Sequence, residues 1–458
     1  METNRAANEI NPADKNKLLR ILGVTFGLSI VIGGMIGGGI LRTPGFVADQ
    51  LGIVWLIVAV WVFGGIYAFF GANTYAELGT MLPRAGGPYV FARRAYGDYG
   101  GFLIGWSDWF LNTSTTAYLA VALGEFTAAL FPALADSIVI ISVTILILLA
   151  ILNWIGLRTG SGVQKLTSLL KVLAFAFIIA ACFIYGGKQD AAAGTQQTPL
   201  LISSPMTLFV AVILSLQAVL ETYAGWMNPV YFSEEDTNPE KNIPRAMFGG
   251  VFIVMAIYVL FNLAMIYVLP MADLAASKLP AADAAQVIFG GFSGQFITAL
   301  ALLSLLGILN VQILSAPRII FALSRDGLFS AKVATVNKGG TPTFALALTI
   351  LISIILAATG TFESLLAVSA FMGLTVDSSV FLALFILRKR EPDLPRPFRA
   401  RGYPLVPLII LVGSILLLIA YVISNTMNSI FALTAMAVSY PLFLTVKVLN
   451  KKRATGNF

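Results

Sequence analysis

The chain has 458 residues, of which 58% are hydrophobic and only 11% are charged, whereas soluble domains carry about 25% charged residues. This composition excludes a soluble globular protein, because too few polar residues remain to cover its surface. The absence of histidine excludes imidazole metal sites and histidine-based catalysis, and the single cysteine, Cys182, excludes an internal disulfide. We expect no metal and no cofactor.

Long gaps between charged residues predict where the chain crosses a membrane, since a spanning helix needs about 20 mostly apolar residues. Twelve segments qualify, and the polar stretch 424–428 separates the last two. The segment before the first span shows no signal-peptide cleavage pattern, so we expect that span to be retained. The predicted spans are 20–48, 52–80, 92–128, 136–156, 162–186, 206–233, 246–270, 292–325, 342–359, 363–388, 404–423 and 428–449.

The positions of the basic residues give the orientation, because cytoplasmic loops carry the excess of Lys and Arg. When the twelve spans alternate across the membrane, all but three of the 29 basic residues fall on one side. The exceptions are Arg42, Lys188 and Lys278. This bias predicts that both termini are cytoplasmic. It also accounts for the net charge of +7 without a nucleic-acid partner.

Two of the predicted spans contain helix-breaking residues. The first span has five glycines within the seven residues 33–39, and each costs about 1 kcal/mol of helix propensity relative to alanine. The sixth span is interrupted at 221–226 and then by Asn228-Pro229. In lipid, unwound backbone is tolerated only where it faces protein or a wet cavity. Breaks at matching positions of two five-helix halves predict an inverted-repeat transporter with its substrate near the midplane.

The chemistry of a broken helix suits an α-amino acid. Free N–H groups at the start of a half-helix attract a carboxylate, and free carbonyls attract an ammonium group. We therefore expect Gly37, Gly38 and Gly39 to bind the carboxylate, and the carbonyls of Met35 and Ile36 to receive the amine. The alternative is close helix packing through small residues, which the same glycines would also permit.

Several short motifs point to one transporter family. They are 37–41 and 43–45 in the first span, 75–79 and 83–89 between the second and third spans, 238–246, 317–318, 325–327 and 391–398. Together they resemble the amino acid–polyamine–organocation (APC) superfamily, and most closely its branch of L-type neutral amino acid exchangers. The resemblance implies an all-α integral membrane protein with a LeuT-type 5+5 inverted repeat, broken helices 1 and 6, and two C-terminal helices.

The same resemblance implies a site on these residues. Gly38 and Gly39 would donate to the substrate carboxylate, and the carbonyls of Met35 and of the helix 6 break would receive the amine. That break supplies the further candidates Glu221, Thr222, Tyr223, Ala224 and Trp226. Tyr223 and Trp226 flank the break, where they would either close over the substrate or serve only in aromatic packing.

Lys171 matches the family's helix 5 lysine, which bridges helices 1 and 8 in place of sodium. This match implies sodium-independent transport. A charged residue within a span costs roughly 3 kcal/mol or more and usually faces the protein interior. The alternative is a lysine that extends to the cytoplasmic interface.

Glu221 departs from the family pattern, because related proteins carry an aromatic gate residue there. An ionised carboxylate would favour a substrate with a second cationic group, and a protonated one would serve proton coupling. Capping of free N–H groups is a third reading. Asp108 and Asp377 are further candidates for coupling or gating inside the membrane.

Two charged features near the cytoplasmic side have simpler readings. Glu77 is expected to form an ion pair that orients the Arg84 loop rather than to carry substrate. The basic run from Arg388 to Arg401 is expected to be a solvated loop that can contact anionic lipid.

The sequence thus predicts a non-enzymatic secondary transporter of the plasma (inner) membrane, working by alternating access. Its expected activity is sodium-independent exchange or facilitated transport of neutral L-amino acids. The alternatives are proton-coupled uptake of cationic amino acids, amines or polyamines, and a transporter-like substrate sensor. No cysteine lies in the loop where L-type exchangers tether a heavy subunit, so we expect no disulfide-linked partner. The expected divisions are the tail 1–19, repeats at 20–186 and 206–388, helices 11 and 12 at 404–449, and the tail 450–458.

Overall fold

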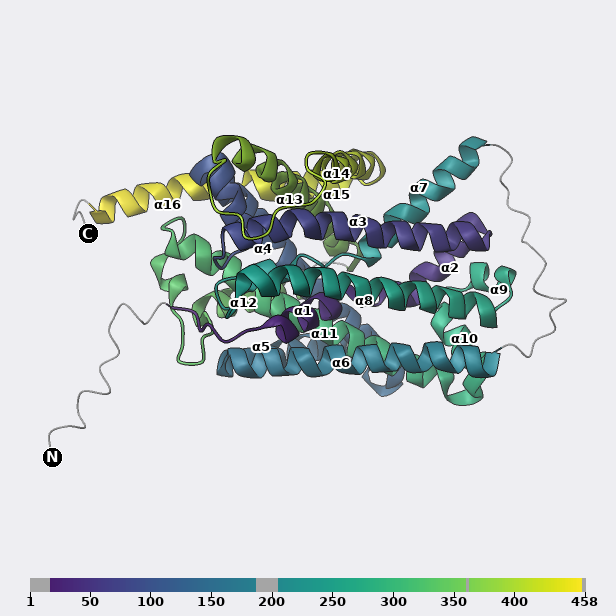
Figure 1. Cartoon of the computed structure of the whole chain (residues 1–458). Coiled ribbons are helices and arrows are strands. Elements are labelled where there is room, and N and C mark those ends of the chain that lie inside the picture. The colour runs from purple at the N-terminus through teal and green to yellow at the C-terminus, as the bar shows by residue number, and fades with distance from the viewer. Residues whose placement is uncertain (1–16, 187–204, 360–361, 455–458) are drawn as a thin grey trace, which may run out of the picture.

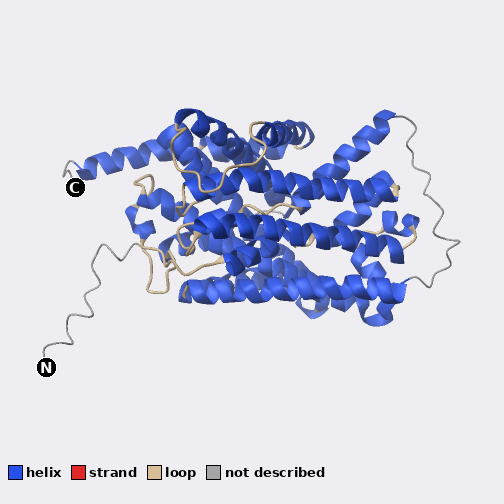
Figure 2. Cartoon of the chain, in the orientation of Figure 1, coloured by secondary structure: helices blue, strands red, loops and turns tan. Residues whose placement is uncertain are grey.

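A computed structural model describes residues 17–186, 205–359 and 362–454. Within these ranges the chain is almost entirely helical and has no β-strand beyond two isolated bridges (Figures 1 and 2). Several of the long helices, among them α3, α6 and α8, run roughly alongside one another in Figure 1. The first described residues and the C-terminal end of α16 lie at the same end of the bundle (Figure 1).

The helices follow the predicted spans in order. They are α1 (Val24–Met35), α2 (Gly39–Leu51), α3 (Val54–Met81), α4 (Pro88–Leu130), α5 (Ile138–Ile155), α6 (Leu157–Ala181), α7 (Pro205–Thr222), α8 (Pro239–Val268), α9 (Met271–Ala276), α10 (Pro280–Phe289), α11 (Ser293–Arg325), α12 (Thr343–Thr359), α13 (Phe362–Arg390), α14 (Leu405–Ser424), α15 (Thr426–Ala437) and α16 (Ser439–Ala454). Short 3₁₀ segments include η4 (Asn228–Phe232), which follows the break after α7.

The described helices confirm a multi-pass membrane protein. Eight of them are long and apolar enough to cross a bilayer, and α15 with α16 counts as one of the eight. The bent pair α1 and α2 raises this number to nine. The helices α7 and α12 are apolar but shorter. The number twelve therefore stays a prediction.

Several predicted boundaries differ from the observed helices; for example, the span predicted at 246–270 corresponds to α8, which already begins at Pro239. The span predicted at 92–128 lies inside the longer helix α4, which contains a kink at Gly97, where φ is +81°. The tail predicted at 450–458 begins inside α16, because this helix continues to Ala454. The predicted tail 1–19 and the basic residue Lys188 fall largely outside the described residues.

The first broken span lies at the centre of the bundle. Helix α1 packs against α6, α8 and α11, and α11 and α13 both pack along α4. The segments that flank the two broken spans are also joined, because Leu22 exchanges backbone hydrogen bonds with Glu235 and Thr237 (both 2.9 Å). The fold therefore brings the two breaks, which are far apart in the sequence, into one region.

Candidate functional site

The two helix breaks contact each other through their backbones. Helix α1 ends at Met35, α2 begins at Gly39, and their axes differ by 47°. Helix α7 ends at Thr222 and is followed by a turn over 223–227. In that turn Gly225 has φ +114°, and a Cβ added to it would lie 2.7 Å from the carbonyl carbon of Gly34. Only glycine fits this position, which holds the two breaks together.

The start of α2 offers free N–H groups. The first four N–H groups of a helix lack intrahelical partners, and no side chain caps this end of α2. Gly38 has open space beside it, because a Cβ there would find only Leu305 Cδ2 within 4 Å, at 3.9 Å. Gly39 is exposed next to Thr222, whereas Gly37 is pressed against Ile308. Of the three glycines, Gly38 and Gly39 are therefore the ones that a carboxylate can approach.

The free carbonyls at the end of α1 already have partners. Lys171 Nζ donates to the carbonyl oxygens of Gly33 (2.9 Å) and Ile36 (2.7 Å). The Lys171 side chain is fully buried and lies against Gly307 of α11, where an added Cβ would be 2.7 Å from Nζ. Lys171 thus lies between α1 and α11 and does not extend to the interface. No carboxylate of the described residues forms an ion pair with it.

Tyr258 of α8 joins the ends of both broken helices. Its hydroxyl lies 2.7 Å from the Met35 carbonyl oxygen and 3.2 Å from that of Thr222. The sequence reasoning missed this residue. The available signal was a tyrosine followed one turn later by Asn262 within an otherwise apolar span. Since Tyr258 and Lys171 occupy the carbonyls of Met35 and Ile36, a substrate amine has more open access to the α7 side of the break.

On the α7 side, Glu221 and Ala224 keep exposed surface. The Glu221 carboxylate has no hydrogen-bond partner among the described residues, and it lies within electrostatic range of Tyr118 and Tyr421. Glu221 stands in the last turn of α7, where carbonyls rather than N–H groups are free, so it does not cap N–H groups. A negative charge at this end of a helix opposes the helix dipole. The end of α7 is therefore suited to bind a cation.

Thr222 closes the edge of the site. Its hydroxyl contacts the hydroxyl of Thr43 on α2 at 3.0 Å and donates to the Ala218 carbonyl at 2.8 Å. Thr43 belongs to the 43–45 motif, but the sequence did not predict it as a site residue. These contacts tie α2 to α7 beside the exposed Gly39.

Tyr223 and Trp226 are both buried against α3, and neither is directed at the free N–H groups of α2. The Tyr223 hydroxyl donates to the Trp61 carbonyl at 3.0 Å, and its ring packs on those of Trp61 and Tyr258. Trp226 packs edge-on against Tyr75, with ring centroids 5.0 Å apart. In this conformation the two aromatic side chains pack the break after α7 against α3.

Asp108 and Asp377 belong to a separate polar cluster. Asp108 is fully buried, and its Oδ1 accepts from Tyr231 (2.8 Å) and Asn112 (3.0 Å). Asp377 accepts a hydrogen bond of 2.5 Å from Tyr75. No Lys or Arg of the described residues pairs with either carboxylate. The cluster links α4 and α13 to α3 and to η4, the segment after the α7 break.

Ion pairs close the end of the bundle that carries the basic loops. Glu234 binds the Nη1 and Nη2 atoms of Arg325 (2.6 and 2.8 Å), and Asp326 binds Arg84 (2.8 Å) and Arg93 (2.6 Å). Burial alone would raise the pKa of Glu234, but hydrogen bonds from Arg325 and the Ala85 N–H lower it below its ordinary value. Burial likewise would raise the pKa of Asp326, but the hydrogen bond and positive charge of Arg84 lower it below its ordinary value.

Glu77 forms an ion pair, as predicted, but its partners do not include Arg84. It binds Arg388 (2.5 Å) and Arg396 (3.2 Å) and accepts the Ala400 N–H (2.6 Å). Glu77 therefore anchors the 391–401 loop and not the Arg84 loop. The prediction that the run from Arg388 to Arg401 is a solvated loop is wrong for Arg396, because the Arg396 side chain is only 5% exposed.

Two broken helices that meet inside a membrane-spanning bundle are typical of a transporter, and the similarity to known proteins agrees with this class. Residues 24–448 match the sequence profile of a family described as Amino acid permease, and the chain belongs to this family. It is a multi-pass amino acid transporter of the APC superfamily.

Named relatives cover nearly the whole chain. The serine/threonine exchanger SteT of Bacillus subtilis is 30% identical over 95% of this chain and 98% of its own length. The mouse b(0,+)-type amino acid transporter 1 is 28% identical, over 89% of this chain and 84% of that protein. The mouse large neutral amino acids transporter small subunit 2 is 27% identical, over 96% and 84% respectively.

Proposed function

We propose that the protein is a sodium-independent exchanger or facilitator of neutral L-amino acids that works by alternating access. The observation that carries the proposal is the contact between the two helix breaks, with the open N–H groups of Gly38 and Gly39 on one side and the end of α7 on the other. An amino acid carboxylate and amine match these two ends. The printed names of the relatives, an exchanger of serine and threonine and a transporter of large neutral amino acids, support the neutral class.

Sodium independence is supported by Lys171. Its ammonium group lies between α1 and α11 and is bound to two carbonyl oxygens of the α1 break. A fixed positive charge among these carbonyls repels a second cation, so a sodium ion has no favourable place beside it.

The proposal includes the architecture expected from the sequence. Twelve spans would form two five-helix repeats, 20–186 and 206–388, followed by helices 11 and 12 at 404–449. The position of the break in the first span of each repeat supports this division. Both termini would be cytoplasmic in the plasma membrane, which agrees with the shared end of the bundle in Figure 1. Cys182, the only cysteine, is fully buried, which supports the expectation of no disulfide-linked subunit.

The test is exchange in proteoliposomes. Vesicles preloaded with unlabelled serine, and vesicles without it, are mixed with labelled serine in choline buffer free of sodium. An exchanger predicts uptake that is several-fold faster with internal serine, and a facilitator predicts uptake without internal serine. Both predict uptake that is unchanged when sodium replaces choline. Strict sodium dependence would refute the proposal, and binding without any accumulation would identify a sensor.

A second candidate, proton-coupled uptake of a cationic amino acid, amine or polyamine, is favoured by Glu221. This carboxylate has no hydrogen-bond partner among the described residues and stands at the negative end of the α7 dipole. Thermal stabilisation of the purified protein by arginine, lysine or putrescine but not by serine would select this candidate, since a ligand of the folded state raises its apparent stability.

A further inference from the structure

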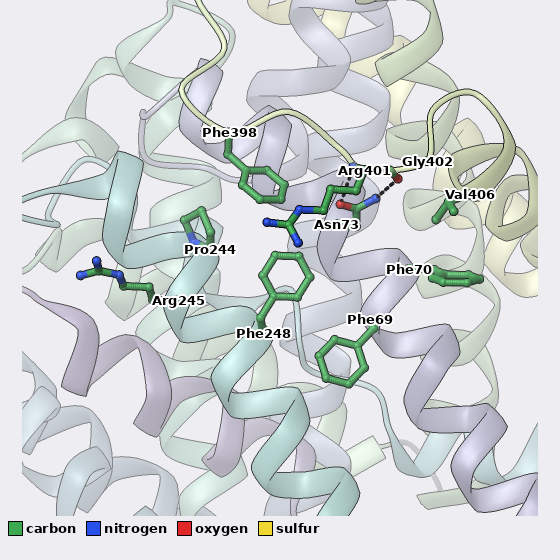
Figure 3. Close-up of a pocket in the computed structure, with 10 residues that line it drawn as sticks. All are labelled: Phe69, Phe70, Asn73, Pro244, Arg245, Phe248, Phe398, Arg401, Gly402 and Val406. Carbon is green, nitrogen blue, oxygen red and sulfur yellow. Dashed lines mark hydrogen bonds between the residues drawn. The ribbon is translucent and has the colours of Figure 1, made fainter.

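A surface groove lies between α3, α8 and the segment that leads into α14 (Figure 3). Its volume is about 630 Å³. Four phenylalanine rings line it, and two arginines stand at its edge. They are Phe69, Phe70, Phe248, Phe398, Arg245 and Arg401. None of these residues belongs to the substrate site described above.

The apolar wall of the groove is ordered by stacking. Phe69 of α3 stacks on Phe248 of α8, with ring centroids 6.1 Å apart and an angle of 15° between the rings. Phe248 in turn packs on Phe398 of the loop at 5.6 Å. The loop is fixed at this place, because Asn73 donates to the Arg401 carbonyl and accepts the Arg401 N–H, each at 2.9 Å. The groove is therefore a built feature and not a gap beside a loose loop.

Among the described residues, the two arginines lack carboxylate partners, as does the neighbouring Arg399, but only Arg245 and Arg401 line the groove. Arg388, Arg390 and Arg396 of the same loop region each pair with Glu77 or Glu391. Within the part of the chain that the structure describes, Arg245 and Arg401 form no ion pair, and both are exposed. Figure 3 shows the Arg401 side chain extending past Phe398 and Phe248 toward the α8 side, whereas the Arg245 side chain is directed away from these rings. One unpaired cation beside the apolar floor and a second at the edge of the groove complement an anion that carries a hydrophobic chain.

The surface beyond the groove continues this pattern into the membrane. Phe252, one turn after Phe248 on α8, is 64% exposed, and Ile66 on α3 and Leu408 on α14 are also exposed. Positive charge at the membrane surface followed by exposed apolar side chains matches an anionic phospholipid, whose phosphate lies at the surface and whose acyl chains lie deeper.

We propose that this groove binds an anionic phospholipid, whose phosphate contacts Arg245 and Arg401 and whose acyl chain lies over Phe69 and Phe248. A bound lipid would join α3 and α8 to the loop that Glu77 anchors. The proposal is independent of which substrate is transported.

Native mass spectrometry of the full-length protein in detergent tests the proposal. The ligands are phosphatidylglycerol and phosphatidylcholine with identical acyl chains. The double variant Arg245→Gln/Arg401→Gln removes the two cations, and Arg399→Gln is the matched control, because Arg399 is an exposed residue of the same loop that does not line the groove. We expect phosphatidylglycerol to bind the wild type and Arg399→Gln equally and the double variant at least five-fold more weakly.

Equal binding of phosphatidylglycerol to the double variant and the wild type would overturn the proposal. Equal retention of the two lipids by the wild type would do so as well, and that comparison holds even if the double variant does not fold. A third arm adds glycerol phosphate. Displacement of the lipid at equal concentration would identify a site for a soluble phosphate and would contradict a lipid site.

Discussion

Gly38→Val tests whether the start of α2 binds the substrate carboxylate. The substitution places a branched side chain beside the free N–H groups at a point where the protein itself has room, since the nearest atom to an added Cβ is 3.9 Å away. Gly38 has φ −67° and ψ −21°, which valine also adopts. The variant is therefore expected to fold and to lose binding.

The expected loss follows from the hydrogen bonds that the side chain blocks. A hydrogen bond to a charged group contributes about 1.5–3 kcal/mol, so the loss of two N–H donors costs about 3–6 kcal/mol. Because 1.4 kcal/mol corresponds to a tenfold change in affinity, the Kd should rise about 10²- to 10⁴-fold.

Binding of a labelled neutral amino acid to the purified protein measures this change. Gly162→Val is the matched control, because Gly162 lies in α6, away from the break, and an added Cβ there meets nothing within 4 Å. The control should bind like the wild type. A monodisperse Gly38→Val protein with an unchanged melting temperature and a Kd within three-fold of the wild type would refute the assignment.

Four further variants or conditions test the rest of the account. Gly225→Ala combines a backbone clash with φ +114°, a conformation that costs about 1–3 kcal/mol for other residues, so its melting temperature should fall clearly; an unchanged value would contradict the contact between the breaks. Lys171→Met leaves two buried carbonyls without a partner and should reduce exchange at least ten-fold, whereas wild-type exchange would remove Lys171 from the mechanism. If the second candidate holds, Glu221→Gln should weaken inhibition by arginine or putrescine at least ten-fold and weaken binding of serine less; equal effects on both would show that Glu221 does not distinguish charge. Folding lowers the pKa of Glu234 and Asp326, so the stability they contribute is present above about pH 4 and is lost as the pH falls below it. Melting curves should show a smaller acid-induced drop for Glu234→Gln than for the wild type, and identical profiles would count against these ion pairs.

Features with a local cause were predictable from the sequence. The break at 36–38 follows from glycines that are adjacent in the chain, and helix positions follow from the lengths of apolar runs. The break after α7 was predictable for the same reason, because Gly225 lies within it and Pro229 follows it. Open space beside Gly38 was expected from its lack of a side chain, although which of the three glycines is open depends on Leu305 and Ile308 of α11.

Features that depend on residues far apart in the chain were not predictable. Glu77 pairs with Arg388, 311 residues away, and nothing in either local sequence distinguishes this partner from the nearer Arg84. Tyr258 completes the site through contacts with two helix ends that only the fold brings together. The outward or inward direction of Tyr223 and Trp226 likewise depends on the position of α3, which hydropathy does not report.

A structure of the protein with a bound amino acid tests the central claim most directly. The ligand would be the neutral amino acid that competes best for exchange, determined by cryo-electron microscopy at saturating concentration. The account predicts density between the two breaks, with the carboxylate within hydrogen-bonding distance of the Gly38 and Gly39 N–H groups and the amine toward the end of α7. Ligand density elsewhere, such as between Asp108 and Asp377, with the space beside Gly38 empty, would contradict it.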